Sequence, residues 1–85
     1  MLYRVEFKPS AARSLGKLPE QVQKRIAVKV NALANNPRPP GVEKLSGAES
    51  LYRIRVGDYR IIYEIQDQVL LVLVVKVGHR GEIYR

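Results

Sequence analysis

Apolar and polar positions alternate along residues 2–8, and this alternation predicts a short strand. The side chains expected on its core face are Tyr3, Val5 and Phe7. Pro9 ends this strand and suits the first turn of a helix, because that position leaves its backbone N–H unpaired anyway. We therefore expect a short helix over residues 10–17, with Ala12 and Leu15 facing inward.

A second helix is predicted to begin at residues 18–20, where a proline precedes an acidic residue. Its apolar stripe recurs at spacings of four, four and three residues and consists of Val22, Ile26, Val30 and Leu33. The sequence Asn-Asn-Pro at 35–37 ends the helix, and a proline-rich loop follows over 37–41. Because the link between the two helices is short, we expect them to form an antiparallel helical hairpin.

From residue 51 the pattern changes to period two, which predicts strands. Residues 51–56 and 59–65 are separated by Gly57-Asp58, a pair typical of a two-residue hairpin turn of type I′ or II′. One face of this hairpin is then apolar or aromatic and carries Tyr52, Ile54, Val56, Tyr59, Ile61 and Tyr63. The opposite face carries Leu51, Arg53, Arg55, Arg60, Ile62 and Glu64.

Residues 69–77 are apolar without alternation, which predicts a central strand covered on both faces. The helices are expected to cover one face, and a C-terminal segment or a partner protein part of the other. Gly78 is expected to end the strand. The predicted fold is α+β, one domain over residues 1–85 in the order β-α-α-β-β-β, with the helical hairpin packed on one face of a mostly antiparallel sheet.

The charge of the chain indicates a polyanionic partner. Fifteen Lys and Arg residues against eight Asp and Glu give a net charge of +7. A solvated basic surface is the simpler alternative. Most of the excess lies in residues 1–42, where eight cations face two acids. The polyanionic partner can be a nucleic acid, an anionic surface or an acidic protein. If it is RNA, the side chains outside the hairpin that we expect to bind it are Lys24, Arg25, Lys29, Lys44 and Lys76.

Other features of the composition exclude several classes of site. The chain has no cysteine and one histidine, which excludes a disulfide framework and a multi-histidine metal site. Its apolar runs are too short for a membrane span, and residues 1–7 do not read as a signal peptide. We expect a cytoplasmic protein that contacts no membrane and needs no metal or cofactor.

The predicted hairpin register places Arg55 directly opposite Arg60. Like charges at such positions destabilise a sheet by up to about 1 kcal/mol. A phosphate bound between the two guanidinium groups would offset that repulsion, because the guanidinium fork matches phosphate oxygens. The alternative is that a carboxylate already neutralises the arginines, and the candidates are Asp58, Glu64 and Glu82.

The sequence Tyr-Arg-Ile-Arg-Val-Gly-Asp-Tyr-Arg-Ile-Ile-Tyr at 52–63, with Val-Gly-His-Arg-Gly-Glu-Ile-Tyr at 77–84, resembles the RelE/ParE superfamily of type II toxin–antitoxin toxins. It is most similar to the RelE branch, and Lys-Leu-x-Gly at 44–47 adds to the likeness. The resemblance implies an endonuclease that cuts mRNA in the ribosomal A site, beside 16S rRNA. It also implies a heteromeric complex with a RelB-like antitoxin that holds the toxin inactive.

The residues on which the resemblance places the site are Arg53, Arg55, Arg60, Arg80 and Tyr84. RNA cleavage by 2′-hydroxyl attack, without a metal, needs a base, charge neutralisation on the phosphorane and an acid. Arginine neutralises well but stays protonated, so Tyr84 is a candidate base or a stacking platform, and His79 is a secondary candidate. Two alternatives remain: a ParE-like inhibitor of DNA gyrase, and a non-enzymatic RNA-binding module.

Overall fold

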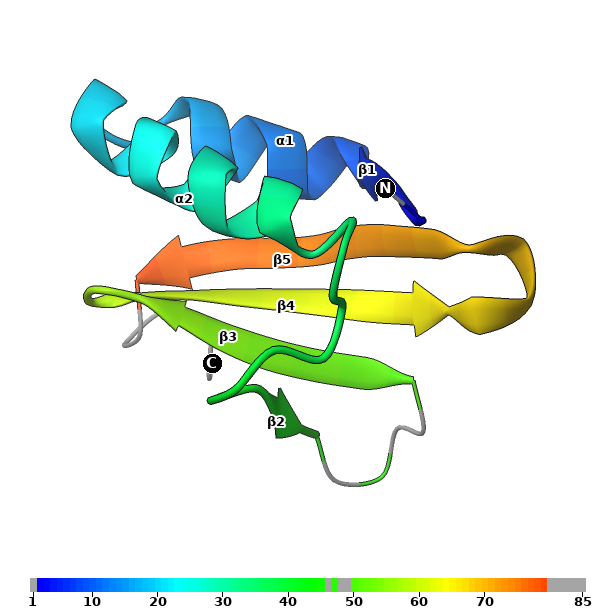
Figure 1. Cartoon of the computed structure of the whole chain (residues 1–85). Coiled ribbons are helices and arrows are strands. Elements are labelled where there is room, and N and C mark those ends of the chain that lie inside the picture. Colours follow the sequence, from blue (N-terminus) through cyan, green and yellow to red (C-terminus); the bar gives the residue numbers. More distant parts are fainter. Residues whose placement is uncertain (1, 46, 48–49, 80–85) are drawn as a thin grey trace.

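Two helices lie on one face of a five-stranded sheet in the computed structural model, which describes residues 2–45, 47 and 50–79 (Figure 1). The elements, in chain order, are β1 (Arg4–Phe7), α1 (Pro9–Gly16), α2 (Glu20–Ala32), β2 (Glu43–Lys44), β3 (Leu51–Val56), β4 (Tyr59–Gln66), the 3-10 turn η1 (Asp67–Val69) and β5 (Leu71–His79). This arrangement confirms the predicted α+β class. No helix within the described residues is long and apolar enough to cross a membrane.

The sheet has the strand order β1-β5-β4-β3-β2. β1 pairs with β5 in parallel, and the other neighbours are antiparallel. The first strand therefore joins a mostly antiparallel sheet, as predicted. The sequence analysis missed β2, an edge strand of two residues that pairs with β3. A segment so short carries no periodicity that a sequence pattern could reveal.

The β3–β4 hairpin has the predicted register, with Arg55 opposite Arg60 and Tyr52 opposite Tyr63. Gly57 has a φ of +59°, whereas Asp58 has no positive φ. A positive φ at the first central position alone defines a type II′ turn. The turn therefore belongs to one of the two types that the Gly-Asp pair predicted, and it fixes which side chains share a face.

The core lies between the helices and one face of the sheet. The apolar stripe of α2 is buried or partly buried as predicted, and Tyr63 and Ile61 beneath it are fully buried. In α1 the prediction was wrong at one position: Ala11 is 1% exposed, whereas Ala12 faces solvent. Ala11 shares a helical face with Leu15 at a spacing of four, and Ala12 lies outside that face.

The limits of the last strand also differ from the prediction. β5 begins at Leu71, because residues 67–69 form η1 and Leu70 adopts a left-handed conformation with φ 52°. It continues through Gly78 to His79, so the glycine does not end the strand. Gly78 pairs with Arg60 and extends the ladder. Within the described residues the helices cover one face of β5, and Lys76 is exposed on the other.

A polar cluster fastens the proline-rich loop to the sheet, at the end where β4 turns into β5. Arg38 donates to both carboxylate oxygens of Asp67, at 2.9 and 3.3 Å, and Tyr3 donates to Asp67 at 2.6 Å. These two donors hold the pKa of Asp67 below its usual value. Beside them the buried Tyr63 hydroxyl donates to the carbonyl of Pro37 at 2.6 Å, and burial raises the pKa of Tyr63 to about 12.

Candidate active site

The face of the sheet away from the helices carries the three predicted arginines, two from β3 and one from β4. They differ sharply in burial. Arg55 is exposed, the side chain of Arg53 is 17% exposed, and Arg60 is only 8% exposed. The sequence predicted that the three arginines share a face, but it gave no indication of how deeply each one is buried. In the structure Arg55 is exposed to solvent, whereas Arg53 and Arg60 are largely buried.

Arg60 lies on β4, an inner strand flanked by β3 and β5. It lies opposite Arg55 on one side and Gly78 on the other. One of its Nη1–H groups points to the carbonyl of Tyr59 at 3.4 Å. Charges at this depth are less screened by water, so an anion that reaches this guanidinium is attracted more strongly than at the surface.

Among the described residues, Glu43 is a carboxylate that lies beside these arginines. It lies on β2 directly opposite Arg53, and its Oε1 accepts from Arg53 Nη2 at 2.7 Å and from Nε at 3.2 Å. Arg53 is the main cause that lowers the pKa of Glu43, and the nearby charges of Arg55 and Arg60 lower it further.

Glu64, one of the carboxylates considered as the alternative to a bound phosphate, does not pair with the arginines. Its two oxygens accept from Ser50 and from Gln66, at 3.3 and 2.6 Å. Asp58 forms no ion pair with a described residue, and Glu82 lies outside the described residues. Sequence reasoning missed Glu43 because its strand was not predicted. The sequence offered only a weak signal for the place of Glu43, which is that it follows the apolar Val42. Val42 packs against the core, and because side chains alternate along a strand, the next residue projects to the opposite face.

His79 does not lie with the arginines. It pairs with Tyr59, and the two rings meet edge to face with centroids 5.5 Å apart. Tyr59 belongs to the face that the helices cover, so His79 projects to that side of the sheet. The expectation that it arrives beside the arginine face was therefore wrong. Arg80 and Tyr84, the other predicted site residues near this end, lie outside the described residues.

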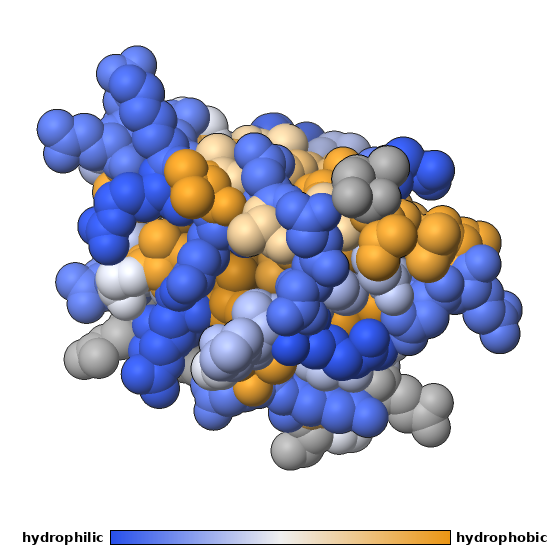
Figure 2. Space-filling view, in the orientation of Figure 1, coloured by the Kyte–Doolittle hydropathy of each residue, from blue (hydrophilic) through white to orange (hydrophobic). Residues whose placement is uncertain are grey.

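The five cations predicted to bind RNA fall on two sides of the molecule. Lys76 pairs with Ile62 and is exposed on the arginine face. Lys44 pairs with Tyr52 and so projects to the helix side. The remaining three are on α2: Lys24, Arg25 and Lys29. Figure 2 shows hydrophilic side chains distributed over the helix side, with apolar surface between them.

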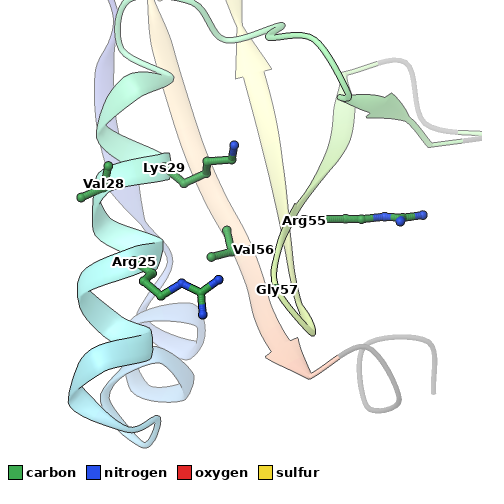
Figure 3. Close-up of a pocket in the computed structure, with 6 residues that line it drawn as sticks. All are labelled: Arg25, Val28, Lys29, Arg55, Val56 and Gly57. Atoms are coloured by element: carbon green, nitrogen blue, oxygen red, sulfur yellow. The ribbon is translucent and has the colours of Figure 1, made fainter.

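Arg25 and Lys29 line a pocket of about 380 Å³ between α2 and the tip of the β3–β4 hairpin. In Figure 3 both side chains extend from the helix toward the hairpin, whereas Arg55 points away on the other side. The guanidinium of Arg25 lies over Gly57, with Nη2 3.2 Å from the place that a Cβ would occupy. The hairpin tip therefore has cations on both of its sides.

This arrangement is suited to binding the phosphates of a nucleic acid. Guanidinium groups bind phosphate oxygens and stabilise the charge that develops on a phosphorane. Within the described residues no three His, Cys, Asp or Glu side chains gather in a way that could hold a metal ion. Fold and site together define a small basic α+β protein with an arginine-rich face on the side of the sheet away from the helices.

The chain belongs to a family of toxins. Residues 5–84 match the sequence model of the family described as the ParE toxin of type II toxin–antitoxin systems, parDE. This match spans nearly the whole chain and confirms the superfamily to which the sequence was predicted to belong.

Individual relatives carry the name RelE. Toxin RelE of Mycobacterium tuberculosis is 34% identical, over 98% of this chain and 87% of that protein. The protein named mRNA interferase toxin RelE of Escherichia coli is 30% identical, over 99% and 92%.

Solved structures agree with these relatives. The archaeal RelE–RelB complex from Pyrococcus horikoshii matches with a TM-score of 0.85 at 32% identity, over 96% of this chain and 99% of that chain. The intact Escherichia coli RelBE toxin–antitoxin complex gives 0.81 at 28%, over 91% and 95%. The likeness confirms the RelE-like fold.

Proposed function

We propose that this chain is the toxin of a type II toxin–antitoxin pair and that it inhibits translation by cleaving mRNA on the ribosome. Family membership and the relative named mRNA interferase support this activity. The observation that carries it is the opposed pair Arg55 and Arg60 on the sheet face away from the helices. Opposed like charges favour an anion between them, and guanidinium groups bind phosphate oxygens.

The cleavage that suits this face is attack of the RNA 2′-hydroxyl on the adjacent phosphate, without a metal ion. Arg55 and Arg60 would bind the non-bridging oxygens and stabilise the phosphorane. The products are a 2′,3′-cyclic phosphate and a 5′-hydroxyl. Arg80 and Tyr84 stay proposed site residues, the first as a phosphate clamp and the second as a base or stacking platform. His79 lies on the opposite face of the sheet, which supports treating it only as a secondary candidate for the base or acid.

The remaining cations would bind RNA around the site. Lys76 extends the arginine face along β5. Arg25 and Lys29 extend the positive surface past the hairpin tip, and Lys24 and Lys44 add to it on the helix side. Phosphate contacts of this kind set affinity and make it fall with salt concentration. We propose that they bind 16S rRNA near the A site.

The proposed inhibitor is a RelB-like antitoxin. The two solved structures described above are complexes of a RelE toxin with RelB. An acidic, partly helical antitoxin would neutralise the +7 charge of this chain, and electrostatic attraction would speed its association. Because the substrate is mRNA on ribosomes, we propose that the toxin acts in the cytoplasm.

Inhibition of DNA gyrase is the second candidate, because the matching family is described by the ParE toxin. The two activities are separable in one set of assays with the full-length chain. A translation extract programmed with a defined mRNA is treated with the toxin, and RNA 5′ ends are mapped with and without ribosomes. Purified gyrase is assayed for supercoiling in parallel.

Ribosome-dependent cleavage that leaves a 5′-hydroxyl would support the proposal. Cleavage of naked RNA at the same rate would contradict dependence on the ribosome. Intact mRNA together with inhibited supercoiling would establish the gyrase inhibitor instead. Binding to ribosomes with neither activity would leave the non-enzymatic RNA-binding module.

A further inference from the structure

Attack by a 2′-hydroxyl needs a base, and Tyr84, the candidate that the sequence suggested, lies outside the described residues. Arginine side chains stay protonated in proteins and cannot accept the proton. The histidine at the end of β5 lies on the other face, against Tyr59. A carboxylate is therefore the kind of group to look for among the described residues of the arginine face.

Three glutamates of the described residues lie on this face, and two are engaged elsewhere. Glu6 on β1 pairs with Arg4 at 2.6 Å, far along the sheet from the opposed arginines. Glu64 uses both oxygens, one with Ser50 and one with Gln66. Glu43 is the third, and it lies beside Arg53 on the strand that borders β3.

The two oxygens of Glu43 are not equivalent. Oε1 accepts both hydrogen bonds from Arg53, whereas Oε2 accepts none from a described residue. The side chain of Glu43 is 48% exposed, so a ligand on this face can reach it. Its carboxylate is close enough to Arg55 and Arg60 for their charges to act on it. One oxygen is thus anchored, and the other is available beside the proposed phosphate site.

We propose that Glu43 is a catalytic residue whose Oε2 accepts the proton of the attacking 2′-hydroxyl, an inference that rests on the proposed function. The proton moves from O2′ to Oε2 while the bond between O2′ and phosphorus forms. The bond between phosphorus and O5′ breaks, and a solvent water protonates O5′. The hydroxide left by that water takes the proton from Glu43, so the carboxylate is restored.

Arg53 acquires a different role from the one that the sequence suggested. Its guanidinium is committed to Glu43 through two donors, so it positions the base while Arg55 and Arg60 bind the phosphate. An ion pair keeps the carboxylate ionised over the whole physiological range. The proton acceptor is therefore ready without prior deprotonation.

The test measures single-turnover cleavage of mRNA on programmed ribosomes, together with ribosome affinity, for the full-length chain and for E43Q. Glutamine keeps an oxygen for Arg53 but accepts no proton. We expect the cleavage rate to fall by about 10²-fold or more, the usual contribution of a general base. Affinity should stay equal or rise, because a negative charge has been removed from a basic face.

E64Q is the matched control, since Glu64 lies on the same face with both oxygens occupied. It should cleave within about threefold of the unmodified chain. Added formate should restore part of the rate of E43A, with chloride at equal ionic strength as the reference. If Glu43 served only as a structural partner of Arg53, formate would not restore cleavage by E43A. The rescue experiment also keeps the proposal testable if E43Q folds poorly.

Normal cleavage by bound E43Q, or loss of affinity without loss of rate, would overturn the role of Glu43. Failure of formate to restore E43A would do the same. If the unmodified chain cuts no mRNA on ribosomes, the proposed function itself fails. The two failures can be told apart. If the unmodified chain cleaves mRNA on ribosomes and E43Q cleaves it equally fast, only the role of Glu43 is contradicted.

Discussion

Arg55 and Arg60 are opposed in register but differ in burial, so their substitutions separate binding from stability. Arg55→Ala should lower cleavage on ribosomes by about 10²-fold, the scale of one lost transition-state donor. Its melting temperature should hold or rise, because a like-charge contact is removed. Single-turnover rates and melting curves on one preparation measure both.

Arg13→Ala is the control for Arg55→Ala, since Arg13 is an exposed cation on α1 in the opposite layer. Arg13→Ala should leave the cleavage rate and the melting temperature unchanged. Arg60→Ala should lower cleavage as strongly, but it should also lower the melting temperature, because the buried stem of Arg60 packs within the sheet surface. Wild-type cleavage by Arg55→Ala would remove that residue from the site.

Tyr63 offers a second test at the residue scale. Its hydroxyl is buried and donates to the carbonyl of Pro37 at 2.6 Å. Tyr63→Phe should lower the free energy of unfolding by about 1–3 kcal/mol, because the carbonyl loses its buried donor. Urea denaturation measures the change. Tyr59→Phe is the comparison, as that hydroxyl bonds no described residue, and an equal loss in both variants would contradict the role of the Pro37 bond.

At the scale of elements, the hairpin turn depends on Gly57, whose φ is +59°. Gly57→Ala should destabilise the protein by about 1–2 kcal/mol, because a Cβ disfavours the left-handed region. It should also displace the Arg25 guanidinium, which lies 3.2 Å from the added atom. Denaturation curves measure the first effect, and salt dependence of ribosome binding measures the second.

Gly16→Ala provides the contrast, because it has no positive φ and an added Cβ meets nothing within 4 Å. Its stability should be unchanged or slightly higher. If Gly57→Ala is as stable as Gly16→Ala, the turn does not depend on the glycine.

Local patterns explain why the helices and the hairpin were predictable. The stripe of α2 and the Gly57-Asp58 turn each depend on neighbouring residues, so they fix which side chains are buried and which arginines are opposed. β2 was not predictable, because two residues show no period and its place depends on pairing with β3. With β2, Glu43 was also missed.

The predicted sheet face of His79 was wrong for a different physical reason. Strict alternation from the buried Val72 would have placed residue 79 on the arginine face. The register between β4 and β5 shifts after Ile62, where β5 carries one extra residue, Val75. This bulge reverses the alternation, so Val77 is buried and His79 projects to the helix side. A bulge depends on packing across the sheet and leaves little trace in the sequence.

At the scale of the whole molecule, Asp67 joins three distant segments: β1 through Tyr3, the proline-rich loop through Arg38, and the β4–β5 connection that contains it. Its pKa is lowered in the folded protein, so its stabilising effect is complete above the ordinary aspartate range. That effect is lost as pH falls below about 4.

Asp67→Asn should therefore melt at a lower temperature than the unmodified chain at pH 7, and the difference should shrink as pH falls toward 3. Melting curves across this range check the prediction. Asp58→Asn is the control, because Asp58 forms no ion pair with a described residue and should show little difference at any pH. A gap that stays constant with pH would contradict an electrostatic origin.

The pairing of β1 with β5 has a consequence for the time at which the protein becomes active. The first strand finds its hydrogen-bonding neighbour in the last strand of the described chain, and α1 packs against that same strand. β1 and α1 cannot form their contacts with β5 until β5 has emerged from the ribosome, because contacts this distant in sequence form late. We therefore expect the complete sheet, with β1 and α1 in their final places, to assemble only after β5 has left the ribosome exit tunnel.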